Sequence, residues 1–314
     1  MEQQLFYHNH PTEHLPLFHQ PFWLDAVAPG AWDVVLIEQE GKLVASAPFV
    51  WKKSLLGTEI IMPKLTQFLG PNMVMQQGNY RERLEKEMQL HEQILKRFSA
   101  HDSFLQRWHF SYQNWLPYYW AGYHQTTRYT YVLDDISDLE ILRKQFSDKV
   151  KREIKKAENN FIVQRSDDVS GFYEMLALNF KGKGMNIPFD APLLQRIYKA
   201  CKKNNAGDIW LSKDAKGKIA GGILVAWDKQ SAYYIIGGKN DAFGNAGVMS
   251  HLFWKCFNDL NGIVKQFDFE GSMLKGVENY FRSFGAEQKG YFEISKINSA
   301  MLSMKAGLRK QFRK

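Results

Sequence analysis

The sequence predicts a mixed α/β fold built from two similar domains, and three observations support this. The 314 residues exceed what one hydrophobic core usually holds. Segments with apolar residues at alternate positions, typical of strands, are interspersed with segments whose apolar residues recur every three or four positions, typical of helices. Residues 41–51 and 217–227 align without a gap, each running from Gly-Lys through small and aliphatic residues to a Trp. We therefore predict two copies of one α/β unit, with a chance likeness between β-hairpins as the alternative.

The patterns place the elements of the first domain as follows. Its strands are expected at residues 33–38, 43–51, 58–62, 66–69, 104–112 and 128–133, and its longest helix at 80–98. We place the boundary near Asp134, which gives domains 1–134 and 135–314.

The second domain is expected to begin with one long helix over residues 137–160, whose second half is strongly basic. Its strands are expected at residues 161–165, 209–212, 218–227 and 232–236, and its further helices at 171–180, 191–204 and 249–260. The basic half of the first helix is either an ordinary solvated surface or a binding surface for phosphate groups.

The positive charge is concentrated in the second domain. Residues 1–127 carry 10 Lys and Arg against 12 Asp and Glu, and subtracting these from the totals of 41 and 33 leaves 31 against 21 for the remainder. The expected partner is anionic: a nucleotide-linked precursor, the phosphates of a cofactor or a nucleic acid, with simple solubility as the alternative.

Cellular location and metal binding are also constrained. Cys201 and Cys256 are too few to cross-link a chain of this length, which fits a reducing compartment. Residues 1–19 lack a basic region followed by an apolar run, and no window approaches about 18 uninterrupted apolar residues. We expect a cytoplasmic protein without a membrane span and without a metal site, because the N-terminal histidines have no ligands at metal spacing.

Residues 267–285 are expected to carry the chemistry. Asp268 and Glu270 alternate with two Phe residues, which predicts that both carboxylates face the same side of a short strand. A glycine ends the strand, and a short helix containing Tyr280 follows. Such a carboxylate could take the proton of an attacking amine, and the alternative is an acid satisfied by backbone N–H groups or by Arg282.

These residues carry a family resemblance. The strand ending in Ile-Gly-Gly, the helix entered through small residues, Phe-Asp-Phe-Glu-Gly at 267–271 and Tyr-Phe-Arg-Ser-Phe-Gly at 280–285 together resemble acyltransferases of the GNAT fold. With the two-domain arrangement and the basic helix at 146–157, the chain is similar to the Fem-type branch. That resemblance implies two tandem GNAT-like domains, each with a mixed central sheet flanked by helices. It also implies transfer of an aminoacyl group from aminoacyl-tRNA to an amine, as in peptidoglycan precursors.

The chain departs from the GNAT pattern at two places. The phosphate-binding loop of that fold corresponds to residues 243–248, where Asn245 and Gly247 are candidate ligands, but the glycines are displaced and the leading basic residue is missing. The Tyr that often protonates the leaving thiolate corresponds to Phe281, so Tyr280 is one position off. Both departures favour a Fem-like donor over acetyl-coenzyme A, and a non-catalytic relative would show them too.

The remaining candidates are expected to bind substrate. Backbone groups and a Lys near Gly237, Gly238 and Lys239 could stabilise the oxyanion. By resemblance to Fem-type proteins, Lys151 and Arg152 are the natural contacts to a nucleotide-linked sugar, and Lys64 of the first domain could face the same cleft. The expected function is thus a Fem-like acyltransferase acting on an amine, including a cell-wall precursor. The alternatives are an acyl-CoA-dependent N-acyltransferase of a small amine and a non-catalytic binding relative.

Overall fold

The chain forms two compact units. The computed structural model describes residues 2–9, 14–74, 77–271, 273–299 and 302–304. Unit 1 comprises the described residues of Met1–Arg128 and Gly290–Lys314, and unit 2 those of Tyr129–Lys289. The sequence placed the whole C-terminal part in the second domain. Strand β12 (Glu287–Ile297) instead pairs antiparallel with β5 (Ser103–Arg107), so the chain from residue 290 groups with unit 1.

Unit 1 is a mixed sheet with helices. Its strands follow the order β1-β2-β3-β5-β12, and β4 pairs with β2. Besides β5 and β12, its elements are α1 (Glu2–Asn9), η1 (Leu17–His19), α2 (Pro21–Val27), β1 (Trp32–Gln39), β2 (Lys42–Ser54), β3 (Gly57–Ile61), β4 (Asn72–Met73), α3 (Tyr80–Phe98) and α4 (Leu116–Trp120). Strand β6 (His124–Leu133) passes from unit 1 into unit 2.

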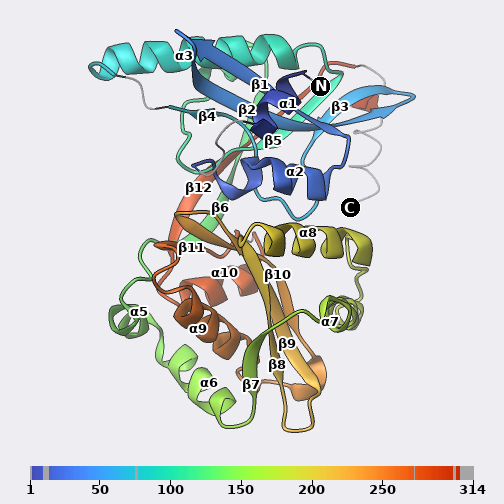
Figure 1. The fold of residues 1–314 in the computed structure, drawn as a ribbon, viewed down its shortest axis with the longest axis vertical. Helices are drawn as coiled ribbons and strands as arrows, with labels where there is room; N and C mark the ends of the chain where they lie inside the picture. Colours follow the sequence, from blue (N-terminus) through green and yellow to red (C-terminus); the bar gives the residue numbers. More distant parts are fainter. Residues whose placement is uncertain (1, 10–13, 75–76, 272, 300–301, 305–314) are drawn as a thin grey trace. The chain divides into compact units, whose positions relative to one another are not determined.

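In unit 2 the strands are hydrogen-bonded in the order β6-β11-β10-β9-β8-β7. Its elements are α5 (Leu139–Gln145), α6 (Asp148–Glu158), β7 (Ile162–Ser166), α7 (Val169–Gly182), α8 (Ala191–Lys203), β8 (Gly207–Lys213), β9 (Ile219–Trp227), β10 (Ser231–Lys239), η2 (Asp241–Phe243), α9 (Val248–Leu260), β11 (Gln266–Asp268) and α10 (Lys275–Arg282). Figure 1 shows α9 and α6 on one side of this sheet and α7 and α8 on the other.

The two units share one order of elements. In unit 1, β1, β2 and β3 are antiparallel, α3 follows, and β5 then pairs parallel with β3. In unit 2, β8, β9 and β10 are antiparallel, α9 follows, and β11 pairs parallel with β10. The predicted mixed α/β fold is therefore confirmed, and the two aligned sequence segments fall on β2 and β9, the middle strand of each antiparallel run.

The predicted helix over residues 137–160 is wrong in one respect, because it is two helices. Phe146 between them is extended, with φ −63° and ψ 140°. The Ser147 hydroxyl accepts a hydrogen bond from the N–H of Val150, which caps α6, while the Ser147 N–H donates to the carbonyl of Ser283. The apolar stripe continues through the break because Phe146 is buried against Phe284 and Phe257. Periodicity alone therefore could not reveal the interruption.

Each unit has its own hydrophobic core. In unit 2 the aromatic side chains of α9, β11 and α10 dominate, and Phe253 contacts the rings of Phe257, Phe269 and Phe284. In unit 1 the core lies between α3 and the sheet, with Phe98 and Phe104 in contact. Within the described residues, no helix combines the length and apolar character needed to cross a membrane.

One buried and one partly buried histidine in unit 1, His19 and His109, predict loss of stability in acid. Burial lowers the pKa of His19 from 6.5 to about 3, with a smaller contribution from the charge of His109, and burial lowers the pKa of His109 to about 4. Both are neutral in the folded protein, so below pH 6.5 the unfolded chain binds more protons. Stability present above pH 6.5 should fall toward pH 4 by up to about 1.4 kcal/mol per pH unit for each histidine.

Urea unfolding of His19→Leu between pH 7 and 4.5 checks this, with the exposed His14→Gln as control. His19→Leu should show a shallower loss of free energy of unfolding with falling pH than the control. Equal slopes in the two variants would contradict a neutral His19 in the folded protein.

Candidate functional site

The site begins where two parallel strands of unit 2 separate. The ladder between β10 and β11 ends at the pair Tyr233 and Asp268, whereas β10 continues to Lys239. Successive backbone N–H groups of a strand point to opposite edges, so alternate N–H groups of residues 234–239 face the side that β11 has left. A register shift between Tyr234 and Ile236 marks the start of this segment. The separation leaves backbone donors available beside the start of α9.

Helix α9 begins at this opening without a side-chain cap. Its N-cap residue Gly247 has φ +78°, and no described side chain bonds to the first N–H groups of the helix. A Cβ at Gly247 would lie 2.2 Å from the backbone carbonyl oxygen of Glu153 on α6, so only glycine allows the two helices this close. The first N–H groups and the positive end of the helix dipole therefore remain available to an anion.

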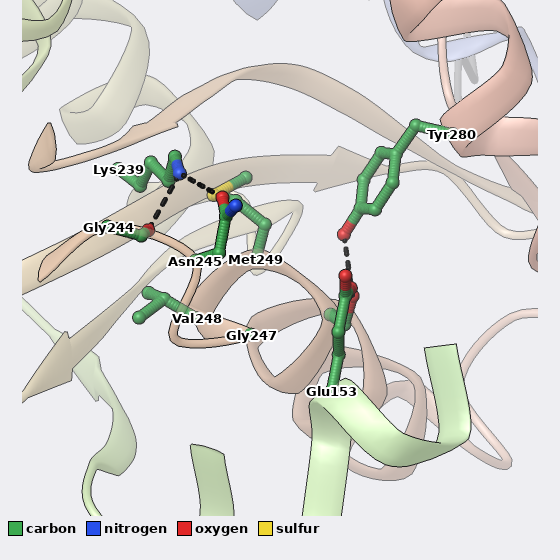
Figure 2. Close-up of a pocket in the computed structure, with 9 residues that line it drawn as sticks. Glu153, Lys239, Gly244, Asn245, Gly247, Val248, Met249 and Tyr280 are labelled. Carbon is green, nitrogen blue, oxygen red and sulfur yellow. Dashed lines mark hydrogen bonds between the residues drawn. The ribbon is translucent and has the colours of Figure 1, made fainter. Parts of the chain in front are cut away.

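A cavity of about 260 Å³ lies over this helix start. Figure 2 shows its labelled residues: Lys239 reaches over the loop from β10, whereas Glu153 of α6 and Tyr280 of α10 approach each other on the far side. The lining consists of Glu153, Lys239, Gly244, Asn245, Gly247, Val248, Met249, Ser250 and Tyr280. All of these residues belong to unit 2.

Three polar side chains from three helices are joined on one wall of the cavity. The Ser250 hydroxyl donates to Glu153 Oε2 at 2.6 Å, and the Ser250 and Tyr280 hydroxyls are 3.0 Å apart. Burial raises the pKa of Tyr280 well above 10, a hydrogen bond with Ser250 lowers it, and the charge of Glu153 raises it further. Tyr280 is thus a neutral phenol near pH 7.

Tyr280, rather than the next residue, is the aromatic side chain at the cavity. Phe281 is 4% exposed and stacks on Phe269 at 4.8 Å between ring centroids, inside the core. The departure at Phe281 therefore does not remove a hydroxyl from this site, because the neighbouring position supplies one from α10.

The two predicted carboxylates do not share a strand face. Strand β11 ends at Asp268, and Glu270 follows in a left-handed conformation with φ +49°. Asp268 is 2% exposed and accepts hydrogen bonds from the Thr130 hydroxyl and from the N–H of Glu270. It therefore fixes the turn after β11. Glu270 interacts electrostatically with Tyr234. Burial raises the pKa of Tyr234, and the negative charge of Glu270 raises it further. Neither acid belongs to the described lining of the cavity.

The basic residues are arranged differently from the prediction. Lys239 Nζ donates to the carbonyl of Gly244 at 2.8 Å and lies 3.5 Å from Asn245 Oδ1. From α6 it is Lys156 that reaches the loop, donating to the carbonyl of Asn245 at 3.1 Å. Lys151 donates to the carbonyl of Lys144 and Arg152 is exposed, and neither is among the described lining residues.

The other predicted residues lie as follows. Gly237 and Gly238 are on the separated part of β10, and a Cβ at Gly237 would meet the carbonyl oxygen of Gly222 at 2.7 Å. Arg282 bonds to Glu278 Oε1 at 2.9 Å on the surface of α10, so it does not satisfy the two acids. Lys64 is exposed in unit 1 after β3, and its place in a shared cleft stays a prediction.

The helix of unit 1 that corresponds in order to α9 begins with its own cap. Asn79 Oδ1 accepts from the N–H of Glu82 at 3.1 Å, and Glu82 Oε2 accepts from the N–H of Asn79 at 3.1 Å, forming a capping box at the start of α3. Donors that are open at α9 are thus occupied at α3. Of the two corresponding helix starts, the one in unit 2 is suited to an anion.

Residues 144–282 match the family described as the acetyltransferase (GNAT) domain. This stretch of the chain is thus similar to GNAT-type acetyltransferase domains. It contains every described residue that lines the cavity. No curated protein sequence matches the chain.

Solved structures show the same fold over most of the chain. A crystal structure of FemX has a TM-score of 0.67 at 13% identity, covering 93% of this chain and 94% of that one. The C-terminal domain of a protein from Agrobacterium fabrum, provisionally named a lysylphosphatidylglycerol synthetase, has a TM-score of 0.58 at 11% identity, with 98% and 96% covered. A tandem GNAT protein from the clavulanic acid biosynthesis pathway has a TM-score of 0.53 at 10% identity, with 88% and 85% covered. The fold is thus the predicted tandem GNAT arrangement.

Two residues of the cavity wall, Glu153 and Ser250, were not predicted from sequence, whereas Lys156 belongs to the basic helix segment that was considered for phosphate binding. Glu153 is an acid within a basic helix, and Ser250 lies 97 positions away from it. One signal was present, because Glu153 and Lys156 share a helix face with Lys149. Nothing in the sequence indicated that this face meets the start of α9.

The close approach at Gly247 predicts a specific loss of stability. Gly247→Ala should be strained by its positive φ, by about 1 to 3 kcal/mol, and should also push α6 away from α9. Gly217→Ala is the matched control, because Gly217 has φ +79° and no described atom within 4 Å of its added Cβ. In urea unfolding, Gly247→Ala should be less stable than Gly217→Ala by about 2 kcal/mol. Equal losses of free energy of unfolding in the two variants would show that the contact between Gly247 and α6 does not limit the size of the residue at this position.

Proposed function

We propose that the GNAT domain of unit 2 transfers an acyl group, in the first instance an aminoacyl group, from an activated donor to an amine. The observation that carries this proposal is the uncapped start of α9, which opens into a cavity walled by Tyr280, Ser250 and Glu153. An anion site and proton-accepting side chains thereby meet within one unit. The GNAT family match supports acyl transfer as the reaction class.

The donor would be held through its negative charge. Its phosphate groups would meet the first N–H groups of α9, where the helix dipole favours an anion. Lys239 and Lys156 hold the loop 244–247 through its carbonyls and place two ammonium groups beside it. The positive balance of residues 128–314 described above attracts such a donor from solution.

The chemistry would then depend mainly on position. An amine held against the donor carbonyl attacks it, and the developing oxyanion needs a hydrogen-bond donor. The N–H groups along residues 234–239 face the separated edge of β10 and are the candidates for that role. Tyr280, neutral and at the cavity wall, can exchange a proton with the reacting groups.

The nature of the donor distinguishes two forms of the proposal. The similarity to Fem-type proteins, supported by the fold shared with FemX, favours aminoacyl-tRNA as donor and a nucleotide-linked cell-wall precursor as acceptor. In that case the exposed Arg152 and the neighbouring Lys151 of α6 would contact the RNA or the precursor phosphates. The GNAT family match favours the second form, an acyl-CoA donor and a small amine. A binding protein without catalysis is the third candidate.

Removing the positive charge at the loop should weaken donor binding. Lys239→Gln should bind coenzyme A or charged tRNA about tenfold more weakly, the loss of about 1.4 kcal/mol expected for one charge-assisted hydrogen bond. Lys216→Gln, in the exposed turn before β9, is the matched control for overall charge. Isothermal titration calorimetry with each donor measures the effect. Absence of binding of either donor to the unaltered protein would refute the proposed function.

Neutralising Lys151 and Arg152 of α6 distinguishes the two donors. The double variant Lys151→Gln, Arg152→Gln should lose affinity for charged tRNA by about tenfold and leave coenzyme A binding unchanged, because neither residue is among the described lining of the cavity. Filter binding at fixed salt concentration measures the first and calorimetry the second. Unchanged tRNA affinity would show that these two residues do not contact an RNA donor.

A further inference from the structure

We propose that Glu153 is the proton acceptor of the transfer and that the amine proton reaches it through Tyr280 and Ser250. This inference rests on the proposed function and adds a proton path to it. The path joins three helices: α10 supplies the phenol at the cavity, α9 the serine behind it, and α6 the carboxylate.

The direction of the hydrogen bonds follows from their chemistry. An ionised carboxylate accepts and cannot donate, so the Ser250 hydroxyl uses its one proton on Glu153 Oε2. The contact between Ser250 and Tyr280 must then have the phenol as donor. The Tyr280 hydroxyl therefore donates a hydrogen bond to the Ser250 oxygen and presents the lone pairs of its own oxygen to the cavity. An amine held there can donate an N–H to that oxygen.

The path is protected from water at its centre. Ser250 is 1% exposed, and Tyr280 is half-buried between the cavity and the core. The Glu153 side chain is 27% exposed, so the proton ends at the side chain that can exchange it with solvent. Lys149 Nζ lies 3.9 Å from Glu153 Oε1, and Lys239 lines the same cavity.

The transfer balances in atoms and protons. The amine nitrogen bonds to the donor carbonyl carbon and gives a proton to the Tyr280 oxygen. The phenol proton passes to Ser250, and the Ser250 proton passes to Glu153. The bond from the carbonyl carbon to the leaving sulfur or oxygen breaks, the leaving atom keeps the electron pair, and it takes one proton from Glu153 by the reverse path or from solvent.

The two acids near β11 are less suited to this role. Asp268 accepts hydrogen bonds from the Thr130 hydroxyl and the Glu270 N–H, which fix the position of its carboxylate. Glu270 is outside the described lining of the cavity and interacts with Tyr234. Glu153 has both a cavity position and a hydrogen-bonded connection to the phenol.

Kinetics test the path directly. Acyl transfer would be followed with acetyl-coenzyme A and with charged tRNA as donors and a panel of primary amines as acceptors. Glu153→Gln, Ser250→Ala and Tyr280→Phe should each lower kcat by about 10²- to 10⁴-fold with little change in KM. Glu158→Gln, which removes a carboxylate from the exposed end of the same helix, is the control. Glu153→Asp should restore part of the rate.

The conservative variant separates catalysis from a structural role. Glu153→Asp keeps a carboxylate on α6 and should be faster than Glu153→Gln, which keeps the size of the side chain but cannot accept the proton. A Glu153→Gln variant that is as fast as Glu158→Gln overturns the path while leaving the proposed function standing. Absence of transfer from either donor by the unaltered protein refutes the function, and the path with it.

A measurement independent of activity tests the connection itself. In urea unfolding, the midpoint shifts of Glu153→Gln and Tyr280→Phe should not add in the double variant, because both residues bond to Ser250. In the Ser250→Ala background the same two shifts should add. Additive shifts with Ser250 present would show that the chain of hydrogen bonds does not exist, and would overturn the proposal whatever the activity.

Discussion

The approach of α6 to the start of α9 is the contact on which the site depends. It brings the Glu153 backbone carbonyl against Gly247, where an alanine Cβ would stand at 2.2 Å. Because α9 begins in a left-handed glycine, its first N–H groups open into the cavity instead of onto a capping side chain. The same approach carries the Glu153 carboxylate to Ser250. One steric requirement thus fixes both the uncapped start of α9 and the hydroxyl-bearing wall of the cavity.

The separation of β10 from β11 contributes the open backbone groups of the site. A parallel pair that ended together would close its backbone groups within the sheet. Here β10 continues beyond the pair Tyr233 and Asp268, while the left-handed Glu270 turns the other strand away. Asp268 holds this turn through Thr130 and the Glu270 N–H, so an acid that resembles a catalytic group instead supports the geometry. This turn keeps the two strands apart beside the start of α9.

Local patterns were sufficient for much of the fold but for little of the site. Strand alternation and the two aligned segments predicted the mixed sheets and the shared order of elements, because such signals repeat within a few residues. Tyr280 and the loop at Gly247 were also found, from the family resemblance. Glu153 and Ser250 could not be paired from the sequence, since their contact depends on helix packing across 97 positions. The break at Ser147 was missed because a capping serine interrupts the helix without interrupting its apolar stripe.

The different helix starts of the two units have a thermodynamic consequence. Asn79 and Glu82 satisfy the start of α3 from within the chain, so that helix gains its full stabilisation on folding. The start of α9 gains the corresponding stabilisation only when an anion arrives. By mass action, anything that binds there also stabilises the folded unit 2. The stability of unit 2 is thereby coupled to occupancy of this helix start, a dependence that the capped helix of unit 1 does not share.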